Sequence, residues 1–329
     1  MAQQHLTSPN PPIAAIDVGS NTIHLVVAIP HKDDGERLET LVDELEFVRL
    51  GAGVGATGRI DPERARRGMA TIKRLRNLAR QAGASIVLGA ATEVMRLAAN
   101  GPEFLARARA ELGLEIPIIS GDQEAAFTFW GAISARDLAP EQPVAVADLG
   151  GGSIELVLGR GRRLDWRHSL PLGSGALHDR FVHSDPPTAD ELHAVRDATA
   201  ATLETVSLPD DAPEGHLFIA CGGTATTLLF FAQRALNIPA GRANLSRAEM
   251  EQASKLLATF PAQEIADRYA IEAQRARILG AGAAVLATLM GRLRASVMEV
   301  SQHGIREGMI LSYSRHGARW LEAAQSGED

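Results

Sequence analysis

The stretch Ile13-Ala-Ala-Ile-Asp-Val-Gly-Ser-Asn-Thr-Ile-His-Leu-Val-Val27 is repeated as Val144-Ala-Val-Ala-Asp-Leu-Gly-Gly-Gly-Ser-Ile-Glu-Leu-Val-Leu158. In each copy an apolar run enters an Asp-x-Gly turn and a second apolar run leaves it, which predicts a β-hairpin with a polar turn. A single Asp-x-Gly is most often only a turn, but a second copy after the same kind of strand favours an internal duplication. Asp17 then corresponds to Asp148, and Gly19 to Gly150. The repeat therefore predicts two similar domains that face each other across a cleft.

Outside the repeat, strand and helix signals alternate along the chain. Apolar runs predict strands at 13–16, 23–29, 41–50, 86–90, 116–119, 144–147 and 217–220. Helices are predicted at 62–82, 103–112, 122–135 and 225–235, capping boxes begin two more at Thr188 and Ser246, and the rest to about residue 321 is expected to be helical. This alternation is typical of an α/β protein with largely covered sheets.

Composition narrows the class of protein. The chain has 329 residues, which favours two domains, and its formal net charge of −7 argues against broad binding to nucleic acid or membrane surfaces. The single cysteine, Cys221, excludes an intrachain disulfide and fits a reducing compartment. Residues 1–12 read as a loose tail without the features of a secretory signal, and the apolar stretch 278–290 is too short to span a bilayer. We therefore expect a cytoplasmic protein.

Basic residues cluster between Arg59 and Arg80. A charge run of this kind is most often the solvated face of a helix. The alternative is a track that guides a long anionic substrate, and the sequence leaves both interpretations open.

The repeated turns suggest phosphate binding, because a phosphate needs several donors that converge on a small volume. Backbone N–H groups of a tight turn supply such donors, and glycine lets the backbone approach closely. The acid before each turn, Asp17 or Asp148, suits a hard cation such as Mg²⁺. A third turn that follows a strand and precedes a helix could place a helix N-terminus against a phosphate. The candidate phosphate-binding residues of these three turns are Gly19, Ser20, Asn21, Thr22, Gly150, Gly151, Gly152, Ser153, Gly222, Gly223 and Thr224.

Two further side chains are candidates for the chemistry. Glu124 is expected in the first turn of a helix where the first domain gives way to the second, and it could orient or deprotonate a water. The plainer interpretation is an acid favoured by the helix macrodipole. Arg96 follows a strand and could clamp phosphate oxygens, although a surface arginine is the commoner case. The pattern Gly53-x-Gly55-x-x-Gly58 lacks the acid of a dinucleotide site about 20 residues on, so it is set aside.

Six motifs in this order resemble the exopolyphosphatase / guanosine pentaphosphate phosphatase family, in the superfamily of sugar kinases, heat-shock chaperones and actin. They are Asp17-Val-Gly-Ser-Asn-Thr22, Ala91-Thr-Glu-Val-Met-Arg96, Ser120-Gly-Asp-Gln-Glu-Ala125, Asp148-Leu-Gly-Gly-Gly-Ser-Ile-Glu155, Gly222-Gly-Thr224 and Gly304-Ile-Arg-Glu-Gly308. The resemblance implies two actin-like (ribonuclease H-like) domains around a central cleft. We place domain I at 1–126 and domain II at 127–329, with the C-terminal helix packing back on domain I.

The same resemblance implies roles for individual residues. Glu124 matches the family's catalytic glutamate, and Asp148 is expected beside the attacking water. Asp17, Asp148 and Glu155 are the implied ligands of Mg²⁺ or Mn²⁺, and Arg96 matches a phosphate-binding arginine. The implied reaction releases terminal orthophosphate, and a homodimer is expected by analogy.

The chain departs from the family pattern at two places. Ala176 stands where an arginine is usual, and Arg277 stands where an acid is common. We hypothesise that the two positions partner each other in relatives and were lost together, which leaves the substrate open. Inorganic polyphosphate is the leading substrate, and guanosine pentaphosphate is the alternative within the same chemistry. A phosphotransferase and a non-catalytic sensor of a nucleotide or alarmone are the other two classes.

Overall fold

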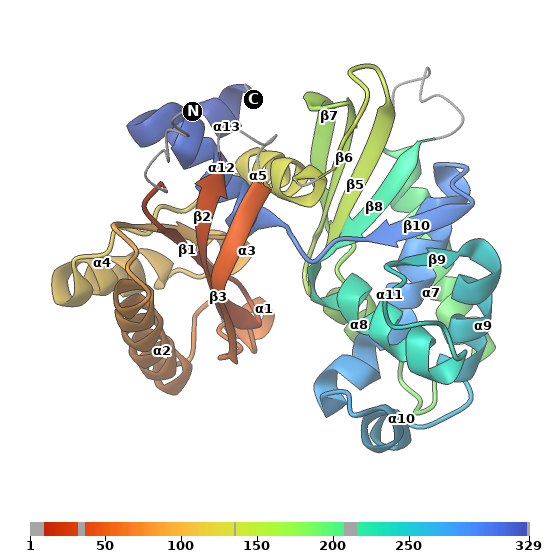
Figure 1. Cartoon of the computed structure of the whole chain (residues 1–329). Coiled ribbons are helices and arrows are strands. Elements are labelled where there is room, and N and C mark those ends of the chain that lie inside the picture. The colour runs from red at the N-terminus through yellow and green to blue at the C-terminus, as the bar shows by residue number, and fades with distance from the viewer. Residues whose placement is uncertain (1–9, 32–36, 135, 207–215, 328–329) are drawn as a thin grey trace.

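The computed structural model describes residues 10–31, 37–134, 136–206 and 216–327, so most of the tail expected at 1–12 lies outside the described residues. Two sheets form the centres of two lobes, seen side by side in Figure 1. A four-stranded sheet has the order β3-β2-β1-β4, and a six-stranded sheet has the order β7-β6-β5-β8-β10-β9. The expected α/β class with two lobes is confirmed.

The first lobe is built on the first copy of the repeat. Its strands are β1 (Ile13–Val18), β2 (Thr22–His31), β3 (Arg37–Phe47) and β4 (Ile86–Ala91), and its helices are α1 (Val54–Thr57), α2 (Pro62–Gln81), α3 (Glu93–Leu97) and α4 (Gly101–Leu112). β1 pairs antiparallel with β2 and parallel with β4. Asp61 caps α2 as expected, because its side chain accepts hydrogen bonds from the N–H groups of Glu63 and Arg64.

The second lobe is built on the second copy and is larger. Its strands are β5 (Pro143–Leu149), β6 (Ile154–Arg160), β7 (Arg163–Leu170), β8 (Leu217–Cys221), β9 (Asn244–Ser246) and β10 (Val297–Val300). Its helices are α6 (Ser174–Phe181), α7 (Ala189–Glu204), α8 (Gly222–Ala235), α9 (Arg247–Leu257), α10 (Ala262–Tyr269) and α11 (Ala273–Arg292). The capping boxes predicted at Thr188 and Ser246 are both present.

The two sheets share one topology. β5 pairs antiparallel with β6 and parallel with β8, as β1 does with β2 and β4, and β7 takes the place of β3. A parallel bridge between Ala91 and Ile118 stands where β10 lies beside β8 in the second lobe. Because parallel neighbours end at the same edge of a sheet, the turns after β1, β4, β5 and β8 all lie at strand ends where ligands bind.

Two helices connect the lobes. α5 (Gly121–Ile133) leaves the first lobe and packs on β5, β6 and β7, whereas α12 (Ile305–His316) leaves β10 and packs on β1 and β2. The short helices η1 (Gly317–Arg319) and α13 (Trp320–Ser326) follow α12 and pack beside it at the top of Figure 1. One buried cluster is shared by α5, α12 and the adjoining faces of both sheets, between the separate cores of the two lobes.

Three expectations about elements were wrong. The strand expected at 41–50 ends at Phe47, since Val48 and Arg49 turn to donate their N–H groups to the carbonyl of Asn21. The strand expected at 116–119 is reduced to the single bridge of Ile118. The last third is not all helical, because β9 and β10 form the far edge of the second sheet.

Candidate active site

The two repeated turns have the same geometry and meet each other. The N–H of Gly19 donates to the carbonyl of Thr22, and the N–H of Gly150 donates to that of Ser153, both over 3.0 Å. A Cβ added to Gly151 would lie 2.6 Å from Nδ2 of Asn21, so the side-chain amide of the first turn rests on the backbone of the second. A larger residue at 151 would displace the Asn21 amide from this position.

The backbone donors of the two turns are free. Across the described residues, no group accepts a hydrogen bond from the N–H of Ser20, Asn21, Gly151 or Gly152. The carbonyls of the second turn are by contrast engaged, because the N–H groups of Gly173, Ser174 and Ala176 donate to Gly152, Gly150 and Gly151. Because these carbonyl groups are already hydrogen-bonded, the turn has only N–H donors available for a ligand. This is the arrangement of an anion-binding nest.

Asp17 and Asp148 place one carboxylate from each lobe below these turns. Both keep part of their surface exposed, so a ligand can reach them. Burial raises the pKa of Asp17 to about 6, Arg306 opposes this rise, and Asp148 adds to it. Burial also raises the pKa of Asp148, against the effects of Arg306 and the Thr128 hydroxyl. The two acids therefore share one electrostatic environment. Oδ1 of Asp17 is buried and has no hydrogen-bond partner among the described residues.

The third turn joins the same place. Gly222 has a φ of +84°, and a Cβ there would lie 2.1 Å from Oδ1 of Asp148, so only glycine fits beside the carboxylate. The hydroxyl of Thr224 is buried and lies 3.1 Å from that of Ser174. Gly222 and Gly223 thus begin α8 at the site, while the hydroxyl of Thr224 holds α6 to α8.

Glu124 lies in the first turn of α5 and is bound by Arg96. Oε2 of Glu124 is 3.1 Å from Nη2 of Arg96, whose Nη1 also donates to the carbonyl of Ile119 over 2.7 Å. Burial and the charge of Glu155 raise the pKa of Glu124 well above its usual value, although Arg96 opposes this. Arg96, predicted to bind phosphate, here orients the predicted catalytic acid.

Glu155 stands opposite Asp148 across the β5–β6 ladder and is almost fully buried. Its Oε1 accepts hydrogen bonds from the hydroxyls of Ser153 at 2.8 Å and Ser169 at 2.7 Å. Burial and the charge of Asp148 raise the pKa of Glu155 to about 7 in spite of these bonds.

Three residues of the site carried no assigned role in the sequence. Arg306, in the first turn of α12, lowers the pKa of both Asp17 and Asp148, and Glu307 beside it is buried and caps α12 at Gly304 over 2.7 Å. A Cβ on Gly152 would lie 2.0 Å from Oε2 of Glu93, so Glu93 reaches across from the first lobe. The signals were present, because all three residues fall within motifs that carry the family resemblance.

The acids fit a divalent cation. Among the described residues, no three His, Cys, Asp or Glu side chains are grouped as a metal site. Mg²⁺, however, is usually bound by one or two carboxylates together with waters and substrate phosphates. Asp17 and Asp148 offer such a pair, and the unpartnered Oδ1 of Asp17 is an oxygen of the required kind. Glu155 has one oxygen committed to two hydroxyls, so it fits a position behind the pair better than a position in it.

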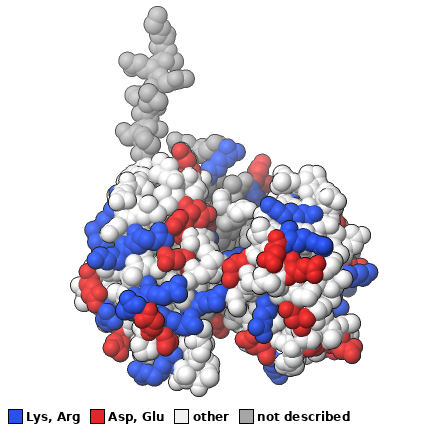
Figure 2. Space-filling model, turned by 90° about the horizontal axis from the view of Figure 1, so that it is seen from below, with Lys and Arg blue, Asp and Glu red and all other residues white. Residues whose placement is uncertain are grey.

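The basic segment 59–80 falls largely on α2, and most of its arginines have partners. Arg66 pairs with Glu63, Arg74 pairs with Glu44 and Glu46, and Arg64, Arg67 and Arg76 donate to backbone carbonyls. Figure 2 shows positive and negative side chains interspersed on the first lobe, which contains α2, and a groove between the two lobes. These contacts favour the solvated helix face over a substrate track.

The residues at the two departures from the family pattern lie on α6 and α11. Nε of Arg277 donates to Nε2 of His178 over 3.1 Å, one helical turn from the backbone contacts between α6 and the second turn. Ala176 contributes its N–H to that turn. In this chain Arg277 therefore contacts position 178.

Comparison with known proteins assigns the family. The profile described as the Ppx/GppA phosphatase family matches residues 28–316. Exopolyphosphatase 2 of Mycobacterium tuberculosis is 32% identical over 317 residues, covering 91% of this chain and 98% of that protein. The crystal structure of the Aquifex aeolicus Ppx/GppA family member has a TM-score of 0.79 at 28% identity and covers 94% and 99% of the two chains. An exopolyphosphatase from Cytophaga hutchinsonii, at 24% identity, has the same fold with a TM-score of 0.82 over 95% and 98%.

No helix within the described ranges is both long and apolar enough to cross a membrane. The duplicated hairpins, their paired acids and these matches lead to one assignment. The chain belongs to the Ppx/GppA phosphatase family.

Proposed function

We propose that this protein is an exopolyphosphatase that hydrolyses the terminal phosphoanhydride bond of inorganic polyphosphate and releases orthophosphate. The observation that carries the proposal is the set of free N–H groups on Ser20, Asn21, Gly151 and Gly152, which two lobes bring together above Asp17 and Asp148. Donors on both sides of a cleft can hold adjacent phosphates of one chain. The activity named for the mycobacterial relative supports the same substrate.

We assign binding roles to the two turns and their acids, and proton transfer to Glu124. The two turns would hold phosphate oxygens, and Asp17 and Asp148 would hold Mg²⁺, or Mn²⁺ in its place. The metal supplies positive charge that neutralises the transferred phosphoryl group. Glu124 would accept a proton from the attacking water, and Arg96 fixes the direction of its carboxylate. Glu155 would act on Glu124, because its negative charge raises the pKa of that carboxyl group.

A second candidate substrate, guanosine pentaphosphate, is favoured by one specific feature. A cavity of about 420 Å³ lies against α8 and the start of α11, lined by Thr226, Phe230, Ile271 and Arg275 among others. It adjoins the Gly222–Gly223 turn through Arg275, which donates to the carbonyl of Gly223 over 3.1 Å. A nucleoside there would leave its phosphates pointing to the turns.

The test is a substrate panel. Orthophosphate release is measured from long-chain polyphosphate, guanosine pentaphosphate and ATP, with Mg²⁺, with Mn²⁺ and with excess chelator. Release from polyphosphate that stops on chelation supports the proposal, and a preference for guanosine pentaphosphate selects the second candidate. If the folded protein releases orthophosphate from none of these substrates, the proposal that it is an enzyme is contradicted. Alarmone binding would then be tested. The homodimer and the cytoplasmic location expected from the sequence are part of this proposal. Gel filtration tests whether the protein is a dimer.

A further inference from the structure

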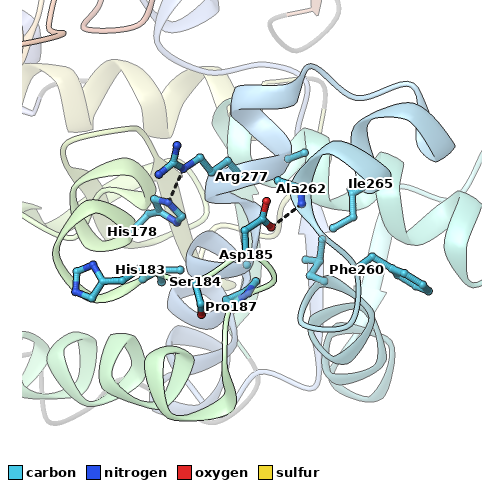
Figure 3. Close-up of a pocket in the computed structure, with 13 residues that line it drawn as sticks. His178, His183, Ser184, Asp185, Pro187, Phe260, Ala262, Ile265 and Arg277 are labelled. Atoms are coloured by element: carbon cyan, nitrogen blue, oxygen red, sulfur yellow. Dashed lines mark hydrogen bonds between the residues drawn. The ribbon is translucent and has the colours of Figure 1, made fainter.

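A second cavity, of about 190 Å³, lies within the larger lobe and outside the candidate active site. It opens between α6, the loop that follows α6, and the helices α10 and α11 (Figure 3). His178, His183, Asp185 and Arg277 are its ionisable lining residues. Apolar walls come from Val182, Pro187, Leu257, Phe260, Ile265 and Ala276.

His178 leaves a hydrogen-bond donor unsatisfied at this cavity. Its Nε2 accepts from Nε of Arg277, so the proton of the neutral ring is on Nδ1. Burial and the charge of Arg277 lower the pKa of His178, which keeps the ring neutral. His178 is 4% exposed, and its Nδ1 is buried with no hydrogen-bond partner in the part of the chain that the structure describes. An unsatisfied buried donor is unfavourable unless a ligand or water meets it.

Arg277 and Asp185 line the same cavity with opposite charges but do not pair. Arg277 donates a hydrogen bond to His178, and Oδ1 of Asp185 accepts one from the N–H of Ala262 over 2.7 Å. Within the described residues, neither side chain forms an ion pair. Figure 3 shows Arg277 above His178, Asp185 between them and the apolar residues Ile265 and Phe260. A cation and an anion are thus both available to a bound molecule.

We propose that this cavity binds a small zwitterion of the aliphatic α-amino acid class. Its carboxylate would accept hydrogen bonds from the guanidinium of Arg277 and from Nδ1–H of His178, and its ammonium group would face Asp185. Its aliphatic side chain would lie on Leu257, Phe260 and Ile265. A simple anion would meet the charge of Asp185, and a simple cation that of Arg277, whereas a zwitterion satisfies both. The volume suits a small metabolite and is below that of drug-sized ligands.

Helix α6 connects the cavity with the candidate active site. His178 is one turn along α6 from Ser174, whose N–H donates to Gly150 over 3.0 Å and whose hydroxyl donates to the same carbonyl over 3.1 Å. α6 therefore connects the cavity with the second phosphate turn. The binding itself does not depend on the proposed hydrolysis.

The test is calorimetric titration of the full-length protein with leucine, with alanine and valine in parallel. Two analogues of leucine separate the charges: 4-methylpentanoate lacks the ammonium group, and isopentylamine lacks the carboxylate. We expect saturable binding of leucine at millimolar concentrations or below, and at least tenfold weaker binding of each analogue. Asp185→Asn and Arg277→Gln keep their structural hydrogen bonds and should each weaken leucine binding by about tenfold.

The control is Asp197→Asn, an exposed acid on α7 that lies near His193, and it should bind as wild type does. Circular dichroism establishes that each variant is folded. No binding of leucine, alanine or valine overturns the proposal, as does binding in which 4-methylpentanoate equals leucine. Unchanged affinity in the folded Asp185→Asn and Arg277→Gln variants overturns it as well.

Discussion

Burial sets the ionisation of the acids at the cleft. The pKa of Asp17 is raised to about 6 and that of Glu155 to about 7, in both cases chiefly by loss of solvent. Since an unfolded chain titrates these groups near 4, ionising them in the folded protein costs stability. That cost is absent below pH 4, where the groups are protonated in both states. It grows as the pH rises from about 4 and is complete above the folded pKa values of about 6 and 7.

Glu155→Gln should therefore be more stable than wild type at pH 8, by on the order of 1–3 kcal/mol. Gln keeps an oxygen for the hydroxyls of Ser153 and Ser169 and removes the charge. The difference in melting temperature between the two proteins should shrink towards pH 5 and vanish near pH 4. This difference is measured by thermal unfolding of both proteins in buffers from pH 4 to pH 8 without divalent metal.

Wild type must be compared with Glu155→Gln because the titration of His24 and His178 changes stability with pH in the opposite direction. Their pKa values are lowered by burial, so acidification below about 6.5 destabilises wild type and variant alike. A stability difference that does not change between pH 5 and 8 would contradict the assigned ionisation of Glu155.

At the residue scale, the sequence predicted neighbours along the chain better than neighbours across the cleft. The Asp-x-Gly repeat predicted that Asp17 and Asp148 lie at corresponding turns, because the acid and the turn are adjacent in sequence. The contact between Glu124 and Arg96 joins residues 28 apart, and no pattern in one sequence predicts it. Arg306 lies within a motif of the family resemblance, but its effect on Asp17 and Asp148 was missed, since the packing of α12 brings these partners to it.

Glycine decides how the two connecting helices pack. A Cβ on Gly308 of α12 would lie 1.8 Å from the carbonyl oxygen of Phe127 on α5, and one on Gly131 of α5 would lie 1.8 Å from that of Gly304. The partners are backbone atoms, which cannot move aside as a flexible side chain does. Gly131 and Gly308 therefore set the distance between α5 and α12.

Gly308→Ala should destabilise the protein by about 3 kcal/mol or more, at the upper end of the range for overpacked cores. The matched control is Gly291→Ala on α11, where an added Cβ meets nothing within 4 Å. That change should be neutral or stabilising by up to about 1 kcal/mol, because alanine is the better helix former. Urea unfolding compares the three proteins, and equal stability of Gly308→Ala and wild type would contradict this account of the packing.

At the element scale, strong periodic signals predicted well and short segments did not. The hairpins, α2 and the two capping boxes follow from patterns that lie within each element. β7 was not predicted, because Arg163–Leu170 is a mixed polar segment at the outer edge of its sheet. β10 has four residues, and its pairing with β8 depends on the rest of the lobe.

The two lobes touch across the mouth of the cleft. Arg49, beside the first turn, pairs with Glu272 at the start of α11 over 3.1 Å. The guanidinium of Arg275 lies 5.0 Å from the ring centroid of Phe47. Both side chains of the ion pair are more than a third exposed, so the pair contributes at most about 1 kcal/mol. These two contacts hold the lobes in a closed arrangement.

The closed arrangement predicts a specific cross-link. In the double variant Arg49→Cys with Glu272→Cys, a short bis-maleimide should join the two thiols within one chain, as detected by mass spectrometry. The native Cys221 is buried and should not react. The control pair, Arg107→Cys on α4 with Glu272→Cys, should remain uncross-linked. Equal cross-linking of both pairs would contradict the closed arrangement.

At the scale of the whole molecule, the repeat was enough to predict two lobes around a cleft, but not how they are joined. The division proposed at residue 126 falls inside α5, which begins at Gly121 and packs on the second sheet. A helix that leaves one lobe and covers the other has no signature in sequence, since its apolar residues are equally suited to either core.

The most direct measurement is orthophosphate release from long-chain polyphosphate with Mg²⁺ by wild type, Glu124→Gln and Asp122→Asn. Both acids lie in the first turn of α5, but Asp122 is exposed and Glu124 is held by Arg96. If Glu124 is the base, Glu124→Gln should lower the rate by about 10²-fold or more and Asp122→Asn should not. Equal rates for all three proteins would contradict the assignment of Glu124 and with it the proposed mechanism.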